Sequence, residues 1–395
     1  MNILMITPDY PPNVFGGIGT YVDWLVDNLV RMGHRVFLIV SRADYFIDHT
    51  YTLERRHNLT IARFDVRSPT SCVYVCNTSL NYYSYKSNCN AITVVKSMDE
   101  LFTGKEDFDI IHVHDHYCAL IFEAAKQIFP GSAAISTIHS CRAGVTYYED
   151  SIRRYVSQSV NHVIAVSKSV KDQMIAKYGH NLPNITVLHG AINSEMLVSQ
   201  TKEGKYLTYV GRLHQIKGVD TLLYAYSRLS DFLVDAKIPP LYIAGDGPER
   251  EKLENICSAL NITQKVHFLG QLDAVHVRGL LDDSKIHIVP SNYEPFGLTV
   301  LEGMARGRCV IASNVGGIPE YIQNGLNGLL FEPNDCDKLA EQLVLALTDD
   351  SLRLKLGQNA LDITKKMTGE HITAEVVKVY QSVLNDFEPV PRNGS

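Results

Sequence analysis

Two carboxylates and two cations in the C-terminal half of the chain have a spacing that suits one extended polar ligand. Glu294 and Glu302 lie eight positions apart, and a turn at 295–297 between them opens an apolar segment. Arg212 and Lys217 lie five positions apart at another predicted turn. Carboxylates accept hydrogen bonds from hydroxyl groups, and Arg and Lys bind phosphate oxygens. These four residues therefore predict a ligand with hydroxyls and a diphosphate.

The segment around the two glutamates predicts an anion site at the start of a helix. Residues 286–289 are typical of a short buried strand, and 298–306 are typical of a helix. The first backbone N–H groups of a helix have no internal partner and point at a ligand. Glu302 would accept hydrogen bonds from two neighbouring hydroxyls, and Glu294 from a second sugar. The alternative is that both are ordinary helix carboxylates. The predicted N–H donors belong to Phe296, Gly297, Leu298 and Thr299.

Arg212 and Lys217 follow a predicted strand at 206–210, and the pattern predicts a helix from Lys217 to about Leu229. Open α/β sheets bind ligands at the carboxyl ends of their strands. Two cations held there would stabilise the charge that develops on a leaving diphosphate. The alternative is two exposed surface cations. Together with the glutamates, they point to a nucleotide sugar and to glycosyl transfer.

Strands and helices alternate along the chain, which predicts an α/β fold with parallel sheets and helices on both faces. A polar stretch at 190–203 separates two series of elements and is the expected linker. The first series of strands is expected near 2–7, 35–40, 59–64, 109–113, 133–138, 162–166 and 185–188, and the second near 206–210, 240–244, 265–268, 286–289 and 309–312.

Several short motifs occur in one order along nearly the whole chain, and together they carry a family resemblance. The chain resembles the retaining glycosyltransferases of family 4, which have the GT-B fold of two Rossmann-like domains facing each other across a cleft. The motifs are Phe15–Gly19, Thr137–His139, Val163–Ser167, Gly211–Leu213 with Lys217–Gly218, Ile243–Pro248, Glu294–Glu302 and Val315–Glu320.

The resemblance implies three parts of the chain. Residues 1–195 would form an acceptor-side domain, and 196–366 would bind the nucleotide-sugar donor. Residues 367–395 would form a helix that crosses back to the first domain, followed by a tail.

The resemblance also implies a donor of the UDP or GDP type, retention at the anomeric carbon, no catalytic metal and no cofactor. His139 would contact the transferred sugar, and the backbone near 243–247 and 267–270 would read the base. The expected catalytic residues are His139, Glu294, Arg212 and Lys217; the expected donor-binding residues are Gly16, Gly17, Arg212, Lys217, Gly270, Glu294, Phe296, Gly297, Leu298, Thr299 and Glu302.

The mechanism that these residues favour is attack by the acceptor hydroxyl from the face that the diphosphate leaves. No carboxylate is clearly placed as a covalent nucleophile. A nucleotide-sugar epimerase of the same architecture and a non-catalytic sugar- or nucleotide-binding protein remain alternatives. A nicotinamide site is disfavoured, because position 22 is Val where a third Gly is needed and no acidic residue closes the second strand.

Length, charge and hydropathy indicate the partners and the location to expect. The chain has 395 residues and a net charge of −6, which argues against nucleic-acid partners. No run approaches the roughly 18 apolar residues of a membrane span. We expect a cytoplasmic protein, with peripheral attachment to the inner face of the membrane left open. The acceptor would be a saccharide, a lipid-linked molecule or a small molecule.

Cysteines and histidines offer weaker signals. Cys72, Cys76 and Cys89 lack the paired spacing of a zinc site, and the other cysteines are expected to be reduced core residues. His112, His114 and His116 lack a standard metal spacing, so no metal site is predicted. Residues 67–90 are irregular and rich in Ser, Asn and Tyr, so they would either shape the acceptor pocket or form a surface loop.

Overall fold

The structure is a computed structural model that describes residues 1–12, 14, 16–41, 47–66, 102, 106–142, 146–198 and 203–388. The irregular segment 67–90 and Cys72, Cys76 and Cys89 lie outside these residues. The chain divides into two compact units. The first comprises Met1–Val166, Val170–Leu188 and the described part of Ile372–Ser395. The second comprises Ser167–Ser169 and His189–His371.

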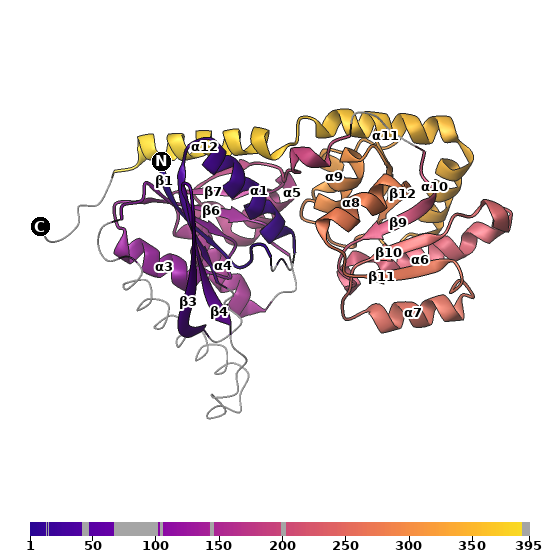
Figure 1. The fold of residues 1–395 in the computed structure, drawn as a ribbon, viewed down its shortest axis with the longest axis horizontal. Coiled ribbons are helices and arrows are strands. Elements are labelled where there is room, and N and C mark those ends of the chain that lie inside the picture. Colours follow the sequence, from indigo (N-terminus) through magenta and orange to yellow (C-terminus); the bar gives the residue numbers. More distant parts are fainter. Residues whose placement is uncertain are drawn as a thin grey trace, which may run out of the picture. The chain divides into compact units, whose positions relative to one another are not determined.

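The first unit is built on an eight-stranded sheet in the order β3-β4-β2-β1-β5-β6-β7-β8. All neighbouring strands are parallel except β3 and β4. Helices lie along the sheet (Figure 1). Its strands are β1 (Asn2–Thr7), β2 (Arg35–Val40), β3 (Ile47–Arg56), β4 (Leu59–Val66), β5 (Ile110–His114), β6 (Ala133–Ile138), β7 (His162–Ala165) and β8 (Asn184–Val187), and its helices are α1 (Gly17–Arg31), α3 (Ala119–Ile128), α4 (Tyr147–Gln158), α5 (Lys168–Tyr178) and most of α12 (Gly369–Asp386).

The second unit is built on a six-stranded parallel sheet in the order β11-β10-β9-β12-β13-β14. Its strands are β9 (Tyr206–Val210), β10 (Leu241–Ala244), β11 (Val266–Gly270), β12 (Ser284–Val289), β13 (Cys309–Ser313) and β14 (Leu329–Phe331), and its helices are α6 (Val219–Ser227), α7 (Arg250–Ala259), α8 (Ala274–Asp282), α9 (Leu298–Ala305), α10 (Cys336–Thr348) and α11 (Asp350–Thr364). The two mainly parallel sheets with helices confirm the predicted α/β class with two Rossmann-like units.

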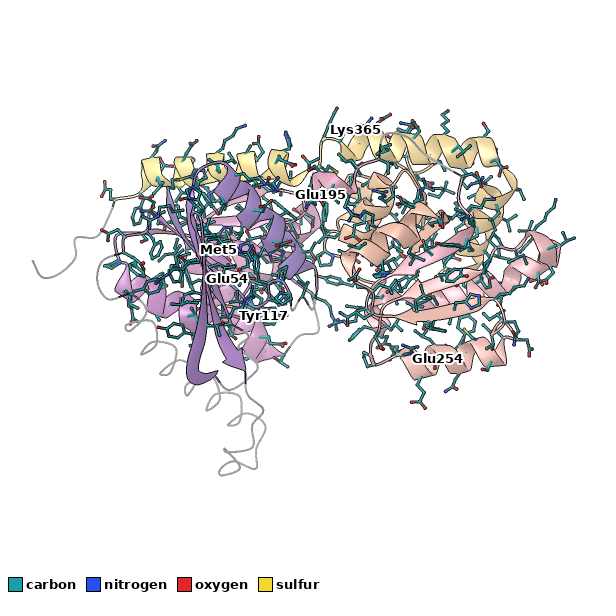
Figure 2. The ribbon with its side chains drawn as sticks, in the orientation of Figure 1. Met5, Glu54, Tyr117, Glu195, Glu254 and Lys365 are labelled. Carbon is teal, nitrogen blue, oxygen red and sulfur yellow. The ribbon has the colours of Figure 1, made fainter. Side chains whose placement is uncertain are left out.

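The central strands are continuous apolar runs, because helices cover both faces of a parallel sheet. Residues Ile3–Ile6 of β1 and Cys309–Ser313 of β13 are all buried. Each buried Val, Leu, Ile or Met side chain among them contributes roughly 1.5–3 kcal/mol through burial. Met5 lies within the first unit, whereas Glu254 of α7 is exposed to solvent (Figure 2). The buried strands thus fix both sheets and leave their strand ends for polar residues.

Two strands, β3 and β14, were not predicted from the sequence. β3 is a polar edge strand that pairs antiparallel with β4 through a turn at Asn58, which has a positive φ of 56°. Its described side chains at 51–56 are exposed or partly exposed and lack the apolar run that marks the central strands. β14 has only three residues. Both lie at sheet edges, where the hydrophobic signal is weakest.

The expected linker at 190–203 is instead bonded into the second unit as far as the structure describes it. Ile192 N–H donates to Met367 O at 3.1 Å, and Val198 N–H donates to Ala305 O at 3.2 Å. Arg306 also donates to Met196 O at 3.0 Å. The expected boundary at residue 195 therefore falls inside the second unit, which begins at His189. Polarity alone did not reveal these backbone hydrogen bonds.

The last helix, α12, carries residues of both units, since Ile372 and the residues after it belong to the first. Within the first unit, Tyr380 OH lies 2.6 Å from Nδ1 of the buried His112. A C-terminal helix thus forms part of the hydrophobic core around β5.

Candidate active site

Two loops of the second unit are joined where neighbouring strands end. β9 and β12 are parallel neighbours, so their carboxyl ends lie at the same sheet edge. The N–H of Asn292 donates to Ile216 O at 2.8 Å. Gly218 has a φ of +60°, and a Cβ there would lie 2.1 Å from Pro290 O. Only glycine allows this approach without strain.

This approach changes one predicted element. Lys217 does not begin the α-helix but ends a short 3-10 turn, Gln215–Lys217. The helix α6 begins after Gly218, at Val219. The apolar spacing predicted the helix, but the left-handed glycine separates the cation from it and turns Lys217 toward the neighbouring loop.

Lys217 and Glu294 form an ion pair. Lys217 Nζ lies 2.7 Å from Glu294 Oε2, and the side chains are only 24% and 9% exposed. Ser291 Oγ donates to the same carboxylate oxygen at 3.1 Å. Glu294 Oε1 receives no hydrogen bond from the described residues. Since an ammonium has three donors, Lys217 also retains hydrogen-bonding capacity toward a further ligand.

The turn after Glu294 is shaped by glycine and held by a tyrosine. Gly297 has a φ of +100° and caps α9 without a side-chain hydrogen bond. Tyr321 OH lies 2.8 Å from Phe296 O and 3.1 Å from Gly297 O. The Phe296 ring is buried and stacks on His189 at 5.7 Å. Phe296 thus anchors the turn, and Leu298 opens the helix.

Glu302 lies on α9, the helix that begins after this loop. It is one helical turn beyond Thr299, which lies at the N-terminal end of the helix. Its side chain is half-buried and has no hydrogen bond or ion pair with the residues that the structure describes. Burial raises the pKa of Glu302 from 4.5 to about 7. A carboxylate with no internal partner is suited to accept hydrogen bonds from a ligand.

Arg212 and Gly270 lie on two further turns at the same end of the sheet. Arg212 is exposed, and its backbone carbonyl accepts a hydrogen bond from Tyr209 OH at 3.1 Å. Gly245 N–H donates to Gly270 O at 2.7 Å. A Cβ on Gly245 would lie 1.9 Å from Gly211 O, so the backbones of the turns at Gly211 and Gly245 are in close contact.

Three supporting residues were not identified from the sequence as part of this site. Tyr209 is buried under the Arg212 turn, Ser291 holds Glu294, and Tyr321 holds the turn at Phe296. Burial raises the pKa of Tyr209, and the charge of Glu294 raises it further. A tyrosine or serine beside a loop has no distinctive spacing, so the sequence carries no signal for these contacts.

The remaining predicted site residues lie in the first unit. Gly16 and Gly17 are exposed at the start of α1, and a Cβ on Gly16 would meet nothing within 4 Å. His139 follows β6 and is partly exposed. Its Nε2 lies 3.1 Å from Nδ1 of His114, and Tyr21 packs edge-on against its ring at 4.9 Å.

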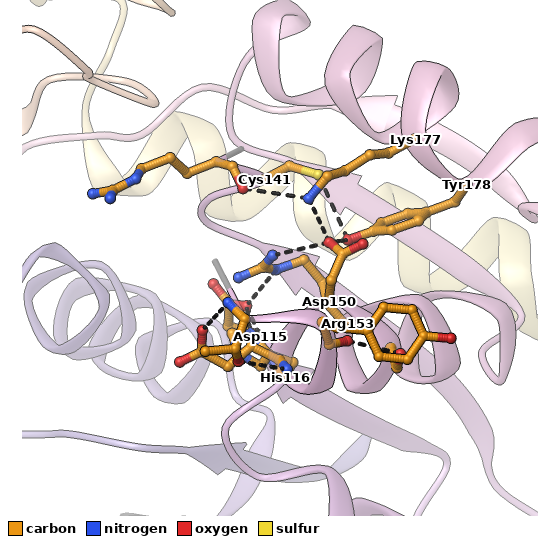
Figure 3. Close-up of polar contacts among 12 residues, drawn as sticks. Asp115, His116, Cys141, Asp150, Arg153, Lys177 and Tyr178 are labelled. Carbon is orange, nitrogen blue, oxygen red and sulfur yellow. Dashed lines mark hydrogen bonds and ion pairs between the residues drawn. The ribbon is translucent and has the colours of Figure 1, made fainter. Parts of the chain in front are cut away.

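A mostly buried ionic network lies at the end of β5 (Figure 3). Asp115 has a positive φ of 62°, and its Oδ1 accepts hydrogen bonds from His116 N and from His116 Nδ1, at 2.9 and 2.6 Å. Arg153 Nε lies 3.7 Å from the same oxygen, and Arg153 Nη1 lies 3.8 Å from Asp150. Burial acts to raise the pKa of Asp115, but His116 and Arg153 lower it below its usual range. Asp115 is thus held ionised.

Asp150 connects this network to α5. It accepts a hydrogen bond from Tyr178 OH at 2.9 Å and pairs with Lys177. Burial acts to raise the pKa of Asp150, but these partners lower it below its usual range. The buried carboxylates and cations therefore neutralise each other, which is the condition for keeping charge inside a protein.

Among the residues described, no group of three or more His, Cys, Asp or Glu side chains is arranged to hold a metal ion. His112 bonds Tyr380 and Thr137. Cys118, Cys141, Cys257 and Cys309 are buried and take part in no disulfide among the described residues. In the same parts of the chain, no helix has both the length and the apolar character needed to cross a bilayer.

Comparison with known proteins identifies the family. The model named Glycosyltransferase Family 4 matches residues 15–196, and that named Glycosyl transferases group 1 matches residues 196–362. An uncharacterised glycosyltransferase of Methanocaldococcus jannaschii is 30% identical over 97% of this chain and 99% of its own. The chain belongs to the group 1 glycosyltransferases of family 4, which transfer a sugar from a nucleotide sugar.

Solved structures agree with this fold. Sucrose-phosphate synthase from Thermosynechococcus elongatus superimposes with a TM-score of 0.79 at 20% identity, covering 98% of this chain and 100% of its own. Anabaena HepE, solved in complex with UDP-glucose, has a TM-score of 0.73 at 17% identity, covering 97% of this chain and 100% of its own. Both likenesses extend over both units.

Proposed function

We propose that this protein is a retaining glycosyltransferase that moves a sugar from a UDP- or GDP-sugar to a hydroxyl acceptor without a metal or another cofactor. The observation that carries the proposal is the ion pair between Lys217 and Glu294, at 2.7 Å. It brings a phosphate-binding cation and a hydroxyl-binding carboxylate to one sheet edge. The complex of Anabaena HepE with UDP-glucose supports a donor of this type.

In this proposal, Lys217 and Arg212 bind the diphosphate and stabilise the charge that develops as the sugar–phosphate bond breaks. Glu294 Oε1 accepts a hydrogen bond from a hydroxyl of the transferred sugar. Lys217 and Ser291 fix the position of its other oxygen. A carboxylate oriented in this way enters the transition state without reorganisation, which favours catalysis over simple binding.

Glu302 binds the two ribose hydroxyls, for which a carboxylate with two accepting oxygens is suited. Its free carboxylate and its position on α9 support this assignment. The N–H groups of Leu298 and Thr299, at the start of the same helix, are donors for a phosphate oxygen.

Retention follows if the acceptor hydroxyl attacks from the face that the diphosphate leaves. In the described part of the second-unit site, Glu294 is the only carboxylate held by an ion pair. Because Lys217 engages it, Glu294 is disfavoured as a covalent nucleophile. The proton of the acceptor then passes to the departing phosphate oxygen.

The test is incubation of the protein with a panel of UDP- and GDP-sugars and simple glycoside acceptors. We expect release of one nucleoside diphosphate that depends on the acceptor, a product with the donor's anomeric configuration by proton NMR, and unchanged rates in EDTA. Isomerised donor without acceptor would establish an epimerase instead. Binding of the donor without any turnover would establish a non-catalytic protein.

A further inference from the structure

A chain of aromatic side chains in the first unit leads to His139. His112 and His114 both lie on β5 and are fully buried. Their rings lie against each other with centroids 4.3 Å apart and an interplanar angle of 33°. His112 is held at both nitrogens, by Tyr380 at 2.6 Å and by Thr137 at 2.7 Å. His114 is therefore fixed by packing, and it contacts His139.

The contact between His114 and His139 joins one nitrogen of each ring. His114 Nδ1 lies 3.1 Å from His139 Nε2, so one of the two nitrogens must carry a proton and the other a lone pair. Burial lowers the pKa of His139 to about 4, and burial also lowers the pKa of His114 well below its usual value. Both rings are neutral at pH 7, and each carries a single N–H.

The second ring nitrogen of His114, Nε2, determines which nitrogen of the His114–His139 pair donates. His114 Nε2 is buried and has no hydrogen-bond partner. If His139 donated to His114, this nitrogen would be a buried N–H without an acceptor, and orphaned buried N–H groups are rarer than unsatisfied acceptors. The hydroxyl of Tyr21 is also buried without a partner, and its ring lies 5.8 Å from that of His114. The unpartnered nitrogen of His114 is therefore assigned a lone pair, and its Nδ1 the proton.

We propose that His114 is a positioning residue that donates from Nδ1 to His139 Nε2 and so holds His139 in the tautomer with a proton on Nδ1. The hydrogen bond made by one ring nitrogen sets the protonation of the other. No described residue forms a hydrogen bond with His139 Nδ1. His139 then presents an N–H donor, not a lone pair, and, resting on the proposed function, this donor binds an oxygen of the transferred sugar.

The tautomer is measured in the free protein, without any substrate. We would record two-bond ¹H–¹⁵N spectra of histidine-labelled protein at pH 7 and assign His139 with H139Q. We expect His139 to carry its proton on Nδ1, whereas free histidine favours Nε2. A wild-type spectrum with the proton on Nε2 overturns the inference, whatever the variants do.

Two variants test the role of His114. H114F removes the donor, and His139 should revert to the Nε2 tautomer. H114N places an amide N–H near the position of Nδ1 and should keep the wild-type tautomer. If H114F folds, as judged by its unfolding midpoint, and His139 keeps the Nδ1 proton, the inference is wrong. If H114F does not fold, the wild-type spectrum still shows whether His139 carries its proton on Nδ1, which tests the inference.

Activity separates this inference from the proposed function. In a transfer assay, H114F should lower kcat roughly tenfold, as loss of an orienting partner does elsewhere, and H114N should restore most of it. Absence of transfer in the wild type would refute the proposed function but leave the tautomer result intact. The Nε2 tautomer in an active wild-type enzyme would refute the positioning role alone.

Discussion

Lys217 Nζ and Glu294 Oε2 lie 2.7 Å apart, although 77 positions separate the two residues in the chain. The contact exists because β9 and β12 are neighbouring strands, and because Gly218 lets one loop approach the other. The two side chains, which we propose bind a diphosphate and a sugar, thus neutralise each other in the free protein.

Replacement of Lys217 by Ala removes the cation and leaves Glu294 with one partner, Ser291. We expect transfer to fall roughly 100-fold or more, as when a charge-stabilising donor is removed from other active sites. The change should lie mainly in kcat, measured with saturating donor. The matched control is K205A in the same unit, where Lys205 pairs with Asp283 at the exposed surface. Equal rates for wild type, K217A and K205A would contradict the assignment.

Gly316 tests the packing that holds Glu294. It has a φ of +60°, and a Cβ there would lie 1.8 Å from Glu294 O. G316A must displace the Glu294 turn, so we expect loss of most transfer activity. Gly325 has a similar φ of +76° but open space around it, so G325A should cost only the conformational term of roughly 1 kcal/mol. Activity and urea unfolding of the two variants separate packing from backbone strain; similar activities would argue against the displacement.

Glu302 should make stability depend on pH. Its pKa is raised by burial from 4.5 to about 7, so the folded state holds the proton more tightly than the unfolded state. The contribution of Glu302 to stability is then fully present below about pH 4.5 and is lost as pH rises through about 7. E302Q should be more stable than the wild type by about 3 kcal/mol at pH 8, with little difference at pH 4. Denaturant unfolding at both values measures this.

The E302Q variant also tests whether Glu302 binds the donor. E302Q should bind the nucleotide sugar more weakly, because an amide accepts through only one oxygen. Calorimetric titration with the donor identified above measures the loss. A variant that gains stability at pH 8 yet binds donor normally would remove Glu302 from the donor site.

Asp115 should have the opposite dependence on pH. Burial acts to raise its pKa, but His116 and Arg153 lower it, so its contribution is present above the usual carboxyl range and is lost on acidification. D115N leaves Arg153 buried with a weaker partner and should lower stability at pH 7 by about 3 kcal/mol. D362N, which removes an exposed pair with Lys365, is the control. A stability loss no greater than that of D362N would show that the network contributes little.

The sequence by itself determined the class of fold and most of the element positions. Apolar runs such as Ile3–Ile6 predict buried parallel strands, since such strands are covered on both faces. Ordered motifs indicated the family, which the comparisons confirmed. The edge strand β3 was missed, because its polar residues carry no such pattern.

Only the tertiary structure decided which side chains meet. Spacing placed Lys217 and Glu294 at strand ends, but their contact depends on strand order and on a close backbone approach at Gly218. The linker expected at 190–203 is bonded to the second unit through backbone groups, which every residue carries alike. The histidine pair of His114 and His139 likewise joins two strands. Such contacts are set by three-dimensional packing, so no one-dimensional pattern contains them.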